Sequence, residues 1–305
     1  MDSGVKDVTN TDGVNASGAG ADHQLVAMID GSHYSESVCD HAAWVARRAG
    51  STVHLVHLIS RKSLGGEPAN LSGSIGLGAR TALLAELAEL DAQKAKLAQR
   101  RGRAILVDAE ARMHADGIDA VATKLRHGEV VETLQEIEDE ADLIVMGKRG
   151  EASDPDSPLL GANLESTVRS TRLPLLVASR SFTEPKRVLL AFDGGRSALK
   201  AVDFFAARPQ YNDLECHLLS VGGADVTRQQ QLEGATTLLR EAGYSVDSAH
   251  IDGQPEAVIT TEVERRDINL VIMGAYGHSR IRNFIIGSTT TEMIRSCKLP
   301  ILLFR

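Results

Sequence analysis

The residues best suited to chemistry lie near the end of the chain, where glycine and hydroxyl residues follow an apolar run. The run LVIMG ends at Gly274, Gly277 follows, and nine residues later the sequence reads Gly287-Ser288-Thr289. A glycine after a buried strand lets a ligand approach the backbone closely. A helix that begins at Ser288 would direct unpaired N–H groups and the positive end of its dipole toward that ligand. The pattern therefore favours the binding of a phosphate group.

Two further side chains fit the same chemistry. Asp193 ends the apolar run VLLAFD, and ligands of open α/β sheets bind at the carboxyl ends of such strands. Its carboxylate could accept hydrogen bonds from ribose hydroxyls or hold a metal ion beside phosphates, and His278 could donate to a phosphate. The alternative is purely structural, with turn glycines and with Ser288 as a helix cap.

The chain contains an internal repeat that places these residues. Three segments of the first half resemble three segments of the second in the same order: 25–38 and 188–202, 142–150 and 269–277, and 170–179 and 296–305. This repeat predicts a disordered tail over 1–22, one domain over 23–180 and a second over 187–305.

Each half alternates short apolar runs with helical patterns, in the order βαβαβαβαβ. Such alternation is typical of parallel sheets, so we expect two tandem five-stranded parallel sheets with helices on both faces, a Rossmann-like α/β fold. The first half carries an insertion over 60–115, in which a leucine-rich helix over 79–101 would be roughly 35 Å long. That helix either packs on the protein or projects as an arm for oligomerisation.

Composition limits the class of partner. The net charge is -8 and the pI is about 5.7, which argues against nucleic-acid binding. No apolar run is long enough for a transmembrane helix, so no membrane partner is expected. Three widely spaced cysteines indicate neither a disulfide framework nor a zinc finger, and free thiols suit the cytoplasm.

The motif G-x-x-G, nine residues, G-S/T resembles the ATP-binding motif of the universal stress protein family, and the repeat resembles that family's tandem, UspE-like members. The resemblance implies units that pair through their last strands, here as an intramolecular pseudo-dimer, and leaves further homodimerisation open. It implies binding of ATP or another adenine nucleotide, with Mg²⁺ as an optional companion. The ribose and metal-side role falls to Asp193 and the adenine-side role to Val221. The phosphate-binding residues it implies are Gly274, Gly277, His278, Gly287, Ser288 and Thr289.

The first half departs from this pattern. Ten residues, not nine, separate Gly150 from Gly161, and Ala162 replaces the hydroxyl residue. The remaining candidates for a second site are Asp30, Gly147, Gly150, Gly161 and Asn163. Lys148 and Arg149 either attract phosphate or are solvated charges. We therefore predict an intact site in the second half and a degenerate or mainly structural one in the first.

The sequence offers little for catalysis. It contains no Walker A, H-E-x-x-H or G-x-S-x-G motif, and no evident arginine finger or water-positioning glutamine for phosphoryl transfer. A nucleotide-binding regulatory protein of the stress response is therefore favoured over an enzyme, with a slow ATPase or nucleotide-transferring enzyme as the alternative. The motif does not discriminate ATP from AMP or cyclic AMP.

Overall fold

The computed structural model describes residues 24–60, 77–150, 161–223, 225–276 and 286–305, with side chains omitted for 77–82. Gly277 and His278, and the tail over 1–22, lie outside these ranges. The elements of the first half are β1 Gln24–Met28, α1 Ser35–Ala49, β2 Thr52–Ile59, α2 Leu77–Ala115, β3 Val121–His127, α3 Val130–Ile137, β4 Leu143–Gly147, α4 Ala162–Ser170 and β5 Leu175–Ala178. Those of the second half are β6 Arg187–Ala191, α5 Arg196–Ala206, the 3-10 turn η2 Pro209–Tyr211, β7 Glu215–Val221, α6 Val226–Glu241, β8 Val246–Ile251, α7 Pro255–Arg265, β9 Leu270–Gly274, α8 Ser288–Ser296 and β10 Ile301–Phe304.

The strands form one continuous sheet of ten, in the order β3-β2-β1-β4-β5-β10-β9-β6-β7-β8. Neighbours within each half are parallel, as predicted. The halves meet where β5 and β10 pair antiparallel, with Leu302 opposite Leu176. Each of these two strands is buried along its whole length. An exposed apolar edge strand would invite aggregation, so the pairing protects both edges.

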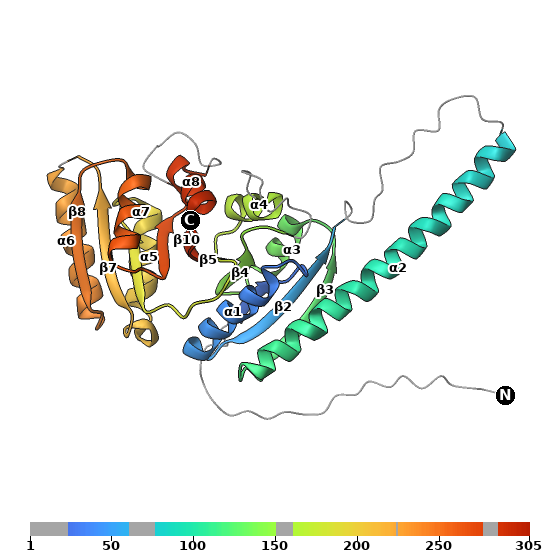
Figure 1. Cartoon of the computed structure of the whole chain (residues 1–305), viewed down its shortest axis with the longest axis horizontal. Coiled ribbons are helices and arrows are strands. Elements are labelled where there is room, and N and C mark those ends of the chain that lie inside the picture. The colour runs from blue at the N-terminus through green and yellow to red at the C-terminus, as the bar shows by residue number, and fades with distance from the viewer. Residues whose placement is uncertain (1–23, 61–76, 151–160, 224, 277–285) are drawn as a thin grey trace.

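Helices cover both faces of the sheet, which confirms the predicted layering (Figure 1). One apolar core contains Val38 of α1, Leu106 of α2 and Ala201 of α5. The other contains Leu134 of α3 and Ile294 of α8. Successive strand residues point to opposite faces, so Leu25 and Val26 of β1 enter different cores. None of the helices in the described ranges is long and apolar enough to span a membrane.

The inserted helix α2 is longer than the predicted 79–101 because the apolar spacing continues to its C-terminus. Leu106, Ala109 and Met113 are buried, and a side chain at Gly102 would collide with His57 and Leu125. The N-terminal turns extend past the sheet (Figure 1). The C-terminal part of α2 therefore packs on the protein, and its N-terminal part projects from it.

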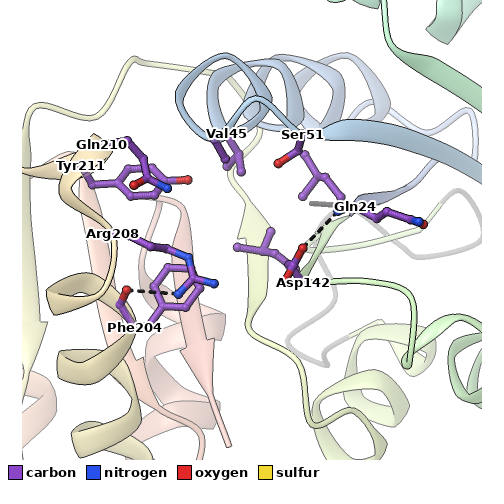
Figure 2. Close-up of a pocket in the computed structure, with 11 residues that line it drawn as sticks. Gln24, Val45, Ser51, Asp142, Phe204, Arg208, Gln210 and Tyr211 are labelled. Carbon is purple, nitrogen blue, oxygen red and sulfur yellow. Dashed lines mark hydrogen bonds between the residues drawn. The ribbon is translucent and has the colours of Figure 1, made fainter. Parts of the chain in front are cut away.

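The halves also meet through side chains beside the sheet. Arg48 of α1 forms an ion pair with Asp213, its Nη2 lying 2.8 Å from Oδ2, and Trp44 lies 5.8 Å from the ring of Tyr211. Figure 2 shows a cavity at this junction, where Val45 faces Tyr211. Its volume of about 20 Å³ accommodates roughly one water molecule, which is too small for an organic ligand.

A buried carboxylate ties α7 to the second half of the sheet. Glu262 is 5 % exposed and accepts hydrogen bonds from Arg265 and Arg266 at 2.6 and 2.9 Å. Its Oε2 also lies 3.4 Å from Nε2 of His217 on β7. The hydrogen bonds from Arg265, and then those from Arg266, lower the pKa of Glu262 from 4.5 to about 2.

Replacement of Glu262 by Gln should therefore lower the free energy of unfolding at pH 7 by about 1–3 kcal/mol, since a charged hydrogen-bond acceptor is lost from a buried site. The stability that Glu262 contributes is fully present above about pH 4.5 and is lost as the pH falls toward 2. Urea unfolding at pH 7 and at lower pH should thus give a smaller acid-induced loss in Glu262→Gln than in the parent chain. The exposed Glu264→Gln is the matched control, and equal behaviour of the two variants would contradict the assignment.

Candidate functional site

A cavity of about 350 Å³ lies at the carboxyl ends of the strands in the second half. That volume falls in the range of small-molecule sites. Residues from β6, β7, β9, α7, α8 and the adjoining loops line it: Ala191, Phe192, Asp193, Leu219, Val221, Pro255, Ile259, Met273, Gly274, Gly287, Ser288, Thr289 and Thr290. The walls are largely apolar, and the polar groups come mainly from Asp193 and the start of α8.

The start of α8 forms one wall of the cavity. Gly287 is the N-cap, with extended backbone (φ -57, ψ 144), and has no side chain to cap the helix. The first N–H groups of an α-helix have no acceptor within the helix, and the helix dipole is positive at this end. Ser288 and Thr289 add hydroxyls. This wall is therefore suited to an anion.

Two hydrogen bonds fix the start of α8 against β9. The hydroxyl of the buried Thr290 donates to the Gly274 carbonyl at 3.0 Å, and the Gly287 amide donates to the Ala275 carbonyl at 3.1 Å. Gly274 itself must be small, because a Cβ there would lie 2.9 Å from Cβ of Ser197. The strand end, α5 and α8 thus approach closely around one point.

Asp193 follows the end of β6, next to the end of the neighbouring strand β7. β6 ends at Ala191, and Oδ1 of the half-buried Asp193 accepts a hydrogen bond from the Gly195 amide at 2.8 Å. Val221 ends β7, and its carbonyl accepts a hydrogen bond from Arg228 at 3.2 Å. Since β6 lies between β7 and β9 in the sheet, parallel pairing brings all three strand ends to the same edge.

The cavity brings together most of the residues that the sequence selected. Asp193, Val221, Gly274, Gly287, Ser288 and Thr289 all line it. Sequence reasoning missed the contribution of α7: Pro255 indicated the start of that helix, but its place over the cavity depends on how α7 crosses the sheet. Within the described ranges no three His, Cys, Asp or Glu side chains gather as metal ligands.

The corresponding region of the first half shares part of this arrangement. Gly161 caps α4 with the same extended backbone (φ -59, ψ 132) as Gly287. A Cβ at Gly150 would lie 2.9 Å from Oδ2 of Asp30, and one at Gly147 would lie 2.7 Å from Cβ of Tyr34. Gly150 therefore lies directly against the carboxylate that would have to receive a ligand.

The carboxylate of Asp30 is hydrogen-bonded within its own loop, as that of Asp193 is by the Gly195 amide. Oδ1 of Asp30 accepts hydrogen bonds from the Ser32 amide at 2.9 Å and the Ser35 hydroxyl at 3.2 Å. Asn163 is exposed in the first turn of α4. The sequence left two interpretations of Lys148, attraction of phosphate or a solvated charge, and its side chain does neither here.

Lys148 instead joins the two halves. Its ammonium group donates to the carbonyl of Cys297, the C-cap residue that follows α8, and burial lowers the pKa of Lys148 to about 8. The equivalent loop of the second half reaches back, because the Tyr276 hydroxyl donates to the Val168 carbonyl of α4 at 3.3 Å. Each strand-to-helix loop thus contacts the last helix of the other half.

The fold is that of a tandem α/β protein, with a cavity of small-molecule size at the carboxyl ends of its second set of strands. The model of the universal stress protein family matches residues 23–179 and 221–305. The chain is also 35% identical to universal stress protein Slr1230 of Synechocystis sp. over 284 residues. That alignment covers 92% of this chain and 99% of Slr1230. The chain belongs to the universal stress protein family.

Solved structures support the same fold. A universal stress protein from Archaeoglobus fulgidus DSM 4304 superimposes with a TM-score of 0.67 at 19% identity, covering 93% of this chain and 98% of that one. Protein PA1789 from Pseudomonas aeruginosa PAO1, described as functionally unknown, gives a TM-score of 0.59 at 15% identity, covering 93% and 92% of the two chains.

Replacing Thr290 by Val should release α8 from β9 while preserving side-chain shape. We expect a loss of about 1 kcal/mol in the free energy of unfolding, because the Gly274 carbonyl loses its buried donor. Thr291→Val, at the next position of the same helix, is the control. Chemical denaturation checks both, and an unchanged Thr290→Val would mean that the hydrogen bond does not hold the helix.

Proposed function

We propose that the second half binds an adenine nucleotide, with ATP as the first candidate, in the cavity between β6, β7, β9 and α8. The observation that carries this proposal is that the uncapped start of α8 and the carboxylate of Asp193 line one cavity of about 350 Å³. The domain division at 23–180 and 187–305 belongs to the same proposal, as does a pseudo-dimer of the two units.

The lining supplies a complement for each part of the nucleotide. Gly287, Ser288 and Thr289 receive phosphate through backbone N–H groups and hydroxyls. Asp193 accepts hydrogen bonds from ribose hydroxyls, and its charge suits a Mg²⁺ ion carried by the phosphates. Gly274 allows the close approach, and Gly277 and His278 extend the phosphate-binding loop by analogy with the family motif.

The apolar side of the cavity suits the adenine ring. Leu219, Val221, Ile259 and Met273 present aliphatic or thioether surface to it. A flat heteroaromatic ring gains from leaving water for such a surface, and the peptide groups near Val221 can hydrogen-bond to the ring edge. Magnesium would supply charge neutralisation of the phosphates.

The first half has a mainly structural role in this proposal. Its Gly150 lies directly against the carboxylate of Asp30, and Lys148 is engaged with the second half. The hydroxyl of Ser288 is replaced by the methyl group of Ala162.

A regulatory role fits the composition of the site better than fast catalysis. Among the described lining residues, Asp193 is the single titratable side chain, so these residues alone supply no pair of general base and general acid. We infer that nucleotide occupancy controls an interaction with another molecule. ATP turnover far above the uncatalysed rate and abolished by Asp193→Ala would favour the slow ATPase instead.

Calorimetric titration with ATP tests the site through matched variants. Asp193→Ala should weaken binding by about 10-fold, the worth of one or two hydrogen bonds, whereas Asp30→Ala at the equivalent position of the first half should leave affinity unchanged. Equal effects of the two variants would contradict the assignment of the site to the second half.

A second variant tests the phosphate wall. Gly287→Val should abolish measurable binding, at least a 100-fold loss on the scale of about 1.4 kcal/mol per factor of ten, because the side chain would occupy the phosphate position. Circular dichroism and thermal unfolding confirm that the variant folds, since Gly287 has a φ that other residues adopt. Undiminished affinity in a folded Gly287→Val protein would disprove the site.

A further inference from the structure

The N-terminal part of α2 extends away from the body of the protein. Among the residues of α2 with a described burial, Gly102 is the first that is buried, and it lies beside His57 and Leu125. The turns before it, residues 77–101, would measure roughly 37 Å at 1.5 Å per residue and project past the end of the sheet (Figure 1). This projecting segment is not used by the proposed nucleotide site.

A narrow leucine seam runs along the projecting segment. Leu83, Leu87, Leu90 and Leu97 occupy alternate spacings of four and three residues, with Lys94 at the one remaining position. Such spacing is the a/d pattern of a helix that pairs with another helix. Leu90 and Leu97 are 46% and 64% exposed, so the seam is open in the single chain.

The sheet of the same chain cannot cover this seam. At 100° per residue, the seam lies about 120° around the helix from the buried Leu106, Ala109 and Met113. The seam therefore faces sideways from the contact with β2 and β3, and a straight α2 keeps it there.

The charges along the same segment change sign from one end to the other. Residues 86–91 contain three acidic residues and no basic one, and residues 94–103 contain five basic residues and no acidic one. The charged residues are Glu86, Glu89, Asp91, Lys94, Lys96, Arg100, Arg101 and Arg103. The charges of such a helix are therefore complementary to those of a second copy that runs antiparallel to it.

We propose that α2 is a dimerisation arm, which pairs antiparallel with α2 of a second copy of this chain. When Leu87 of one copy lies opposite Leu97 of the other, Leu90 lies beside Lys94 of the second copy. Glu86 and Glu89 then lie within two residues of the level of Arg100 and Lys96 of the second copy, and the reverse pairs form by two-fold symmetry. A parallel pair would set acid against acid and base against base.

Lys94 fits this arrangement as a register device. A single lysine in an apolar seam reduces stability but selects one alignment. In the antiparallel pair it lies beside Leu90 and one residue away from the level of Asp91 of the second copy, whereas a slip of one heptad would place it beside Leu83 or Leu97, farther from any acidic residue. The exposed leucines and the charge gradient thus specify the same partner.

Analytical ultracentrifugation of the full chain over a concentration series tests the arm. The parent chain should form a dimer, and Leu90→Glu combined with Leu97→Glu should raise the dimer dissociation constant by at least about 100-fold, because charges would enter the seam. Val107→Glu is the matched control, since Val107 is 61% exposed on the same helix but about 120° from the seam. A monomeric parent chain, or a dimer insensitive to the seam variant, would overturn the proposal.

Charge reversal tests the antiparallel direction separately. Glu86→Arg alone and Arg100→Glu alone should each weaken the dimer several-fold, and the double variant should restore it, because residue 86 of one copy meets residue 100 of the other. A double variant that dimerises more weakly than both single variants would contradict antiparallel pairing. The dimer dissociation constant is measured without nucleotide, so this test does not depend on the proposed function.

Discussion

The site depends on the parallel pairing of β6 with β9. Val188 lies opposite Leu270 and Ala191 opposite Met273, so the two strands end at the same edge of the sheet. Asp193 follows one strand and Gly274 ends the other, and these residues meet although a whole series of elements separates them in the chain. Thr290 then holds α8 on the Gly274 carbonyl, which places an uncapped helix start opposite the carboxylate. The positions of Asp193, Gly274 and α8 around the cavity all depend on this strand register.

We propose a different role for the same architecture in the first half, because a few side chains differ. The backbone at Gly161 copies that at Gly287, and Asp30 occupies the position of Asp193. Yet Gly150 lies against the Asp30 carboxylate, and Lys148 extends to the end of α8. A repeated fold thus supports one candidate site and one surface that contacts the other half. Tyr276 makes the opposite contact with α4, so the two strand-to-helix loops connect the halves in both directions.

Much of this arrangement was predictable from local sequence. Buried parallel strands such as LIVMG and LVIMG are continuous apolar runs, and Gly287 before Ser288 indicates the start of a helix. Other features depended on distant partners. The direction of Lys148 depends on where α8 ends, and the wall formed by Ile259 depends on how α7 crosses the sheet. The pairing of β5 with β10 was expected from family resemblance alone, because an apolar edge strand does not reveal which edge it will meet, and its antiparallel direction was not predicted.

The measurement that tests the central claim most directly is the stoichiometry of ATP binding to the full chain by calorimetry. An intact site built on Asp193 and the start of α8, beside a first half whose Gly150 lies against Asp30, predicts one nucleotide bound per chain. Two equivalent sites per chain would contradict the asymmetry between the halves, and the absence of binding by any adenine nucleotide would contradict the site itself.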